Sequence, residues 1–146
     1  MFGPYMHASP NMNLTPDIAK AIDGEYTAVL CYEQLAKMAP SEEARKQILE
    51  IRNDEIRHYQ MFSKLYTSLT GRQHTPHLNE PCPGSYLEGV RSSFKDEQET
   101  VDAYLDIFDR AHDPRIKHEF SRAAADEQNH AVWFLYFLKE DAHEGK

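Results

Sequence analysis

One arrangement of polar residues occurs twice in this chain, and it restricts the possible folds more than any other feature. In each half, a glutamate is followed seven residues later by a tyrosine and thirty residues later by a Glu-x2-His motif. The two copies lie 72 residues apart, about half of the 146-residue chain. One Glu-x2-His is expected by chance, but its repeated pairing with an upstream glutamate and tyrosine is not. The first copy contains Glu25, Tyr32, Glu55 and His58, and the second contains Glu97, Tyr104, Glu127 and His130.

Both copies lie in stretches whose apolar residues recur every three or four positions, the pattern of a helix with one buried side. Residues that favour helix starts are Thr15, Ser41, Ser85 and Asp113, and Gly71 favours a helix end. We therefore expect four helices, at about residues 15–39, 41–69, 85–111 and 113–139.

The connections between these helices predict how they are arranged. The first and last connections are short, so each joins two antiparallel neighbours. The middle one, residues 71–84, is long enough to cross the length of a bundle. The expected fold is all-α: an antiparallel four-helix bundle of two similar helical hairpins with a long crossover loop. We expect the bundle to span residues 15–140, between a flexible N-terminal tail at 1–14 and a C-terminal tail at 141–146.

The repeated acids lie within the apolar sides of the helices, near their middles. Equal spacing in both halves places four glutamates at one level of the interior, where unpaired anions cost several kcal/mol each. A cluster of protonated acids and histidines is the alternative, but two divalent metal ions balance four carboxylates and leave both imidazoles neutral. Carboxylate and imidazole together suit iron or manganese. The expected metal ligands are Glu25, Glu55, His58, Glu97, Glu127 and His130.

Further repeated residues flank the ligands. We expect the hydroxyls of Tyr32 and Tyr104 to bond ligand carboxylates, with simple packing as the alternative. Asp54 and Asp126 immediately precede the Glu-x2-His motifs. They either bond a ligand histidine on a neighbouring helix or are solvated, and the sequence leaves both readings open.

Composition and the remaining residues exclude several classes. The net charge of −8 and the lack of a dense Lys/Arg run argue against nucleic-acid binding. No apolar stretch is long enough for a membrane span, and no signal segment opens the chain, so we expect a cytoplasmic protein. Cys31 and Cys82 are then expected as reduced thiols, and without a Cys-x2-Cys pair no iron–sulfur cluster is expected. The apolar segment 133–138 is expected to be buried on both sides, by the loop, a tail or another subunit. The histidines expected in solvent are His74, His77, His112 and His118.

These motifs resemble the ferritin-like di-iron carboxylate proteins, and most closely their rubrerythrin-type branch. The resemblance implies terminal carboxylates at Glu25 and Glu97 and bridging carboxylates at Glu55 and Glu127, with His58 or His130 on each metal.

The chain also departs from the patterns of this group. It shows no rubredoxin-type cysteines, and Thr100 stands where rubrerythrin has an extra glutamate. Ile56 stands where bacterioferritin has its haem-binding methionine, so no haem is expected.

The resemblance implies a redox function in which a bound Fe(II) pair is oxidised by peroxide or O2, with the six ligands as the catalytic residues. It also implies a homodimer and an external electron donor that the sequence does not name. Two alternatives stay open: a non-enzymatic protein that binds or stores iron, and a di-manganese site of the catalase type.

Overall fold

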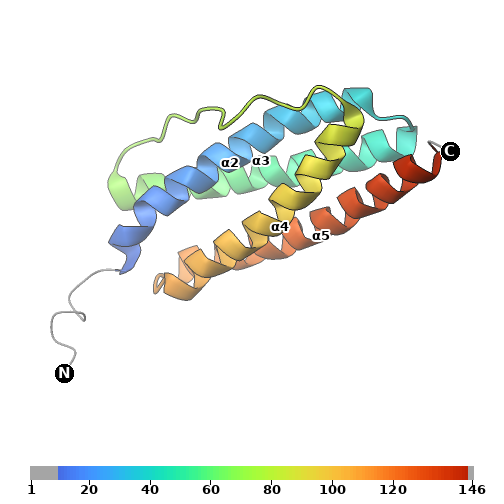
Figure 1. Cartoon of the computed structure of the whole chain (residues 1–146). Helices are drawn as coiled ribbons and strands as arrows, with labels where there is room; N and C mark the ends of the chain where they lie inside the picture. The colour runs from blue at the N-terminus through green and yellow to red at the C-terminus, as the bar shows by residue number, and fades with distance from the viewer. Residues whose placement is uncertain (1–9, 145–146) are drawn as a thin grey trace.

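The computed structural model describes the backbone of residues 10–144 and the side chains of residues 14–142. Its described part consists of four long helices: α2 (Pro10–Met38), α3 (Glu42–Thr70), α4 (Tyr86–Arg110) and α5 (Pro114–Glu144). The extensive contacts are made within each hairpin, between α2 and α3 and between α4 and α5 (Figure 1). The predicted all-α, ferritin-like bundle of two hairpins is confirmed.

Local hydrogen bonds explain most of the helix ends. The Ser41 hydroxyl accepts from the backbone N–H of Ala44 at the start of α3, and Ser85 does the same for Glu88 in α4. Gly71 ends α3 with a φ of 74°, a left-handed conformation that glycine adopts without strain. These ends lie within a residue or two of the predicted ones.

Two helix ends differ from the sequence-based expectation. Helix α2 begins at Pro10 and not at Thr15, so Pro16 lies inside the helix. An internal proline removes one backbone hydrogen bond, but the extra turn carries Leu14, which is completely buried. Helix α5 continues beyond 139 to Glu144, directly before the glycine at 145. Residues 10–14, expected within the flexible N-terminal tail, are therefore helical. Residues 1–9 and 145–146 lie outside the described residues, so the flexibility expected of the rest of the N-terminal tail stays a prediction.

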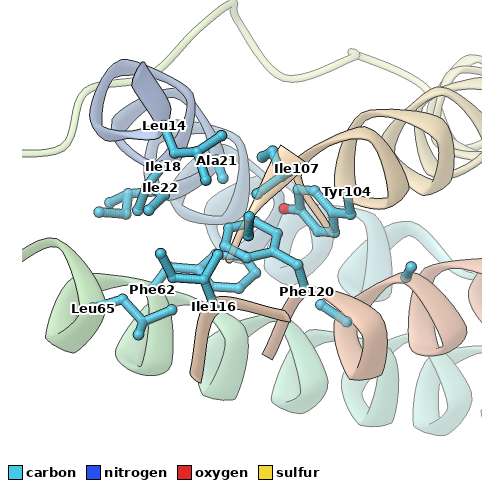
Figure 2. Close-up of a cluster of buried hydrophobic side chains, with 13 residues drawn as sticks. Leu14, Ile18, Ala21, Ile22, Phe62, Leu65, Tyr104, Ile107, Ile116 and Phe120 are labelled. Carbon is cyan, nitrogen blue, oxygen red and sulfur yellow. The ribbon is translucent and has the colours of Figure 1, made fainter. Parts of the chain in front are cut away.

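The interior contains two apolar clusters, separated along the bundle axis by a layer of polar residues. In the first cluster, drawn in Figure 2, Phe62 of α3 and Phe120 of α5 stack with ring centroids 4.2 Å apart. Tyr104 of α4 packs edge-on against both rings. In the second cluster, Tyr32 of α2 packs against Phe134 of α5 at 5.2 Å. Both clusters therefore join helices from the two hairpins.

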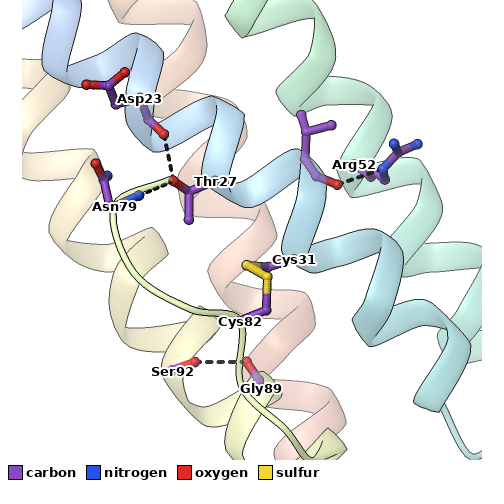
Figure 3. Close-up of a disulfide and its surroundings, with 9 residues drawn as sticks. Asp23, Thr27, Cys31, Arg52, Asn79, Cys82, Gly89 and Ser92 are labelled. Carbon is purple, nitrogen blue, oxygen red and sulfur yellow. Dashed lines mark hydrogen bonds between the residues drawn. A yellow bond between two sulfur atoms is a disulfide. The ribbon is translucent and has the colours of Figure 1, made fainter. Parts of the chain in front are cut away.

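The crossover loop runs along α2 from the end of α3 to the start of α4 (Figure 1). Cys31 of α2 and Cys82 of the loop form a disulfide with Cα atoms 5.2 Å apart, as Figure 3 shows. The prediction of two reduced thiols is therefore wrong. The cysteines are 51 residues apart in sequence, and only the path of the loop over α2 brings them together.

The apolar end of α5 is more exposed within the chain than expected. Leu135 is 52% exposed and Tyr136 is also exposed, whereas Phe134 and Phe137 are buried. The loop does not cover this side of the helix, because it follows α2. None of the described helices has the length and apolar character needed to cross a membrane.

Candidate metal centre

Six side chains from all four helices meet between the two apolar clusters, and we call them the polar layer. All six are almost completely buried. They divide into two groups of four, within each of which one potential ligand atom per residue lies within 4.8 Å of the others. Glu55 and Glu127 belong to both groups. The first group adds Glu25 and His58, and the second adds Glu97 and His130.

Each histidine directs its Nδ1 atom at the glutamates of its own group. His58 Nδ1 lies 3.3 Å from Glu25, 3.1 Å from Glu55 and 3.2 Å from Glu127. His130 Nδ1 lies 3.4 Å from Glu97, with Glu55 and Glu127 slightly farther away. Each nitrogen therefore faces three carboxylates, one of its own and two that are shared.

The polar layer also contains the buried polar atoms that lack a hydrogen-bond partner. Among the described side chains, six buried nitrogen or oxygen atoms have none, and each belongs to a different residue of the layer. They are one oxygen of each of the four glutamates and the Nδ1 atoms of His58 and His130. Buried polar atoms are nearly always paired, since an unpaired one costs about 1–3 kcal/mol. This set has the chemistry of a ligand set, because all six atoms have lone pairs and lie together.

Residues of the opposite hairpin orient the ligands. Nε2 of His58 lies 2.8 Å from Asp126, and Nε2 of His130 lies 2.7 Å from Asp54. A carboxylate that accepts the Nε2 proton leaves the Nδ1 lone pair free for a metal. Of the two readings left open for these aspartates, the structure supports the bond to a histidine.

The two tyrosines also bond across the hairpins. Tyr32 donates to Glu97 at 2.6 Å, and Tyr104 donates to Glu25. Burial raises the pKa of both phenols, and the negative layer glutamates raise it further. Both hydroxyls therefore keep their protons and act as hydrogen-bond donors.

The carboxylates of the polar layer interact strongly when no metal is bound. Burial raises the pKa of Glu55 and of Glu127 well above the usual range, and repulsion from the other glutamates adds to this. Burial also acts to raise the pKa of Glu97, but Glu127, His130 and the Tyr32 hydroxyl outweigh it and lower the pKa. Glu55 and Glu127 therefore retain protons where a metal is absent.

The histidines show the opposite balance. Burial disfavours their charged form, but the carboxylates around each ring outweigh it and raise the pKa of both. For His130 these carboxylates, Glu97 first, raise the pKa to about 9. For His58 they are Asp126 and three glutamates of the layer. The metal-free layer therefore attracts positive charge.

A cleft of about 600 Å³ between α2 and α4 leads to the four layer glutamates. Acidic side chains line it, among them Asp17, Glu80, Asp96 and Glu99. Burial raises the pKa of Asp96 to about 6, and repulsion from Glu80 and Glu99 contributes. A negative cleft favours the entry of cations over anions.

Sequence reasoning missed one cluster, at the crossover loop. His74 is only partly exposed and its Nε2 lies 2.9 Å from Asp23, so the expectation of a solvated side chain is wrong. His77 Nε2 lies 3.3 Å from the same carboxylate, although this ring is largely exposed. The spacing of His74 and His77 was visible in the sequence, but nothing there indicated that Asp23 of α2 would face them. His112 and His118 are exposed, as expected.

Comparisons with known proteins agree with this geometry. The family model for rubrerythrin matches residues 18–82, which cover most of α2, all of α3 and most of the crossover loop. The uncharacterized protein YhjR of Bacillus subtilis is 53% identical over 127 residues, which cover 87% of this chain and 88% of YhjR. No solved structure matches the chain significantly. With its four-helix fold and its buried carboxylate and histidine groups, the chain belongs to the rubrerythrin family of ferritin-like di-iron carboxylate proteins.

Proposed function

We propose that the polar layer binds two iron ions and that the protein is a redox protein, which uses this pair to reduce peroxide or O2. One observation carries the proposal: six buried atoms without partners, one from each layer residue, face one another in two groups that share Glu55 and Glu127. Glu25 and His58 would complete the ligand set of one ion, and Glu97 and His130 that of the other.

The donor set fits two divalent ions by charge and by type. Four carboxylates carry four negative charges, which two divalent ions neutralise without protonation of either histidine. Oxygen and imidazole donors suit iron or manganese, whereas structural zinc sites usually contain cysteine or more histidine. Without metal, the Glu55 and Glu127 carboxyls retain protons because burial and the other glutamates disfavour their negative charges. Metal binding replaces these protons.

When bound, the iron pair would supply the two electrons that, with two protons, convert one peroxide into two waters. The surrounding residues would hold the ligand side chains in the same positions during this reaction. Asp54 and Asp126 hold the histidine rings with Nδ1 inward, and the tyrosine hydroxyls hold Glu25 and Glu97. The cleft between α2 and α4 gives a small oxidant access to the carboxylates. An external reductant is needed to complete a cycle.

The first test is the metal content per chain after anaerobic loading with Fe(II) and desalting, measured by mass spectrometry. We expect two irons in the parent and a clear loss in Glu127→Gln, which removes a shared ligand. Glu140→Gln is the matched control, because Glu140 lies on the exposed side of the same helix. No retained iron in the parent, or equal iron in all three proteins, would contradict the site.

The second test is stopped-flow mixing of the Fe(II) protein with peroxide and with O2. Oxidation faster than that of free Fe(II), with two irons oxidised per chain, supports the redox function. Iron uptake far above two per chain in air would support storage instead. Release of O2 from peroxide by the manganese form would support a catalase-type site.

A homodimer is part of this proposal, and it is supported by the apolar surface that α5 leaves exposed. Val132 and Leu135 are 63% and 52% exposed. Light scattering of the purified protein tests it: a mass of twice 16.9 kDa is expected, and a monomer would contradict it.

A further inference from the structure

A second group of metal-binding residues lies where the crossover loop meets α2. Asp23 of α2 is 7% exposed and faces two histidines of the loop. His74 Nε2 lies 2.9 Å from one oxygen of this carboxylate, and His77 Nε2 lies 3.3 Å from the other. One potential ligand atom from each of the three residues lies within 4.8 Å of the others.

These distances are close to those that a single metal ion imposes. A first-row ion such as Zn²⁺ binds imidazole nitrogen and carboxylate oxygen at about 2.0–2.2 Å, so neighbouring ligands of a tetrahedral site lie about 3.3–3.6 Å apart. The two His-to-Asp distances are at or slightly below this range. Because one donor atom of each residue lies within 4.8 Å of the others, side-chain rotations can bring all three around one ion.

A purely structural role does not account for the whole arrangement. The contacts that hold the loop at this point involve one oxygen of Asp23, which accepts from the His77 backbone N–H and contacts the His74 ring. The His77 side chain is 71% exposed, so it gives up rotational freedom to approach the second oxygen. A bound ion explains why that ring faces the carboxylate.

The cluster is distinct from the polar layer. Asp23 and Glu25 are two residues apart on α2, which turns their side chains about 200° from each other around the helix axis. Glu25 points into the bundle interior, whereas Asp23 faces the loop. An ion at Asp23 would therefore bind independently of the iron pair.

We propose that Asp23, His74 and His77 form a mononuclear site for a divalent transition-metal ion with an affinity for imidazole, such as Zn²⁺. Three protein ligands leave at least one coordination position for water or a small ligand on the exposed side of His77. The ion fastens the middle of the crossover loop to α2, as the disulfide fastens its end. This proposal does not depend on the redox function.

The test adds Zn²⁺ to iron-loaded, desalted protein without an affinity tag. Zinc and iron per chain are measured by mass spectrometry, and the zinc Kd is measured by calorimetry. We expect one zinc per chain with both irons retained. In His77→Ala the zinc is lost or its Kd rises at least about tenfold. His118→Ala, which removes an exposed histidine of α5, is the control and should match the parent.

Two outcomes would overturn the proposal: no zinc beyond the iron pair, or the same zinc affinity in His77→Ala as in the parent. A pair of variants tests zinc binding at the loop independently of iron binding in the polar layer. Glu127→Gln and the double variant Glu127→Gln/His77→Ala should differ by one zinc per chain even if the layer binds no iron. Equal zinc in the two would contradict the loop site alone.

Discussion

The two hairpins are nearly equivalent inside the bundle and different outside it. Inside, the Tyr32 ring packs against Phe134, and the Tyr104 ring packs against Phe62, 72 residues from Phe134, although the first pair is tilted and the second edge-on. Outside, Asp23 and Cys31 of α2 hold the crossover loop, whereas the positions 72 residues later in α4 are Lys95 and Ala103, both exposed.

The hydrogen bonds across the polar layer show why the interior residues of one half are repeated in the other. Each tyrosine bonds a glutamate of the other hairpin, and each histidine bonds an aspartate of the other hairpin. Neither hairpin contains a complete set of these partners, so each half requires the other. No such requirement acts on the outer surface, where Asp23 and Cys31 of the first hairpin bond the loop.

Truncation of one buried phenylalanine in each apolar cluster should cause the largest loss of stability. It tests whether the two clusters are equivalent. Phe62→Ala and Phe134→Ala each remove a completely buried ring, so each should lower the free energy of unfolding by about 3–5 kcal/mol. Urea unfolding of the metal-free proteins measures this, with the exposed Leu105→Ala of α4 as a control expected within about 0.5 kcal/mol of the parent. A large loss in one phenylalanine variant and a negligible one in the other would break the comparison.

Removal of the disulfide tests the part that the hairpins do not share. A crosslink between residues 51 apart should stabilise by up to about 4 kcal/mol, chiefly because it restricts the unfolded chain. Cys31→Ser/Cys82→Ser should therefore unfold at lower urea, and the parent in excess dithiothreitol should match it. We expect both forms to retain two irons, since the crosslink lies outside the polar layer. A parent whose stability does not change on reduction would contradict the crosslink.

The aspartates behind the histidines should have a smaller effect. Asp54→Asn and Asp126→Asn each replace the charged acceptor of a ligand histidine with a neutral amide, so each should weaken iron binding about 10–100-fold. Competition with a chelator measures the affinity, and Asp102→Asn, an exposed aspartate of α4, serves as the control. Similar losses are expected because the two His–Asp distances differ by only 0.1 Å. If only one variant is affected, the two halves of the layer are not equivalent in function.

The pH dependence of the metal-free protein tests the charge states of the polar layer. The raised pKa of Glu55, Glu127, His58 and His130 means that the folded state holds protons that the unfolded chain releases. Their stabilisation is complete below the unfolded pKa of about 4.3 for glutamate and about 6.5 for histidine. It is lost as the pH rises through the folded values, about 9 for His130.

Groups with lowered pKa act in the opposite direction at the acid end. The lowered pKa of Glu97 and of Asp126 costs stability only below about pH 4. Thermal unfolding should therefore give the highest Tm near pH 5 and a steady fall towards pH 9. In the iron-loaded protein this fall should be smaller, because bound metal replaces the protons. A metal-free Tm that rises from pH 5 to 9 would contradict these charge states.

Much of the bundle could be predicted from the sequence because its constraints are local and periodic. Apolar spacing and capping residues such as Ser41 and Ser85 depend on neighbours within a turn or two. The repeat placed Glu25, Glu55, Glu97 and Glu127 at one level because equal spacing along antiparallel helices gives equal height. The helix start at Pro10 was missed because burial of Leu14 outweighs the cost of Pro16, and this burial is a tertiary effect.

The loop could not be predicted in the same way, because its contacts join residues with no common spacing. Cys31 and Cys82 lie 51 residues apart, and the contacts from His74 and His77 to Asp23 depend on the path of the loop over α2. A polar loop with several prolines gives no periodic signal for that path. What covers the exposed side of Leu135 stays a prediction, since an apolar segment does not reveal its partner.

The most direct test of the account is anomalous diffraction at the iron absorption edge from crystals of the iron-loaded protein. Two iron peaks about 3.5–4 Å apart are expected between the apolar clusters. One should be bound by Glu25 and His58 and the other by Glu97 and His130, with Glu55 and Glu127 contacting both. A single peak, or iron bound by residues of one hairpin alone, would contradict the claim that the two halves complete one site.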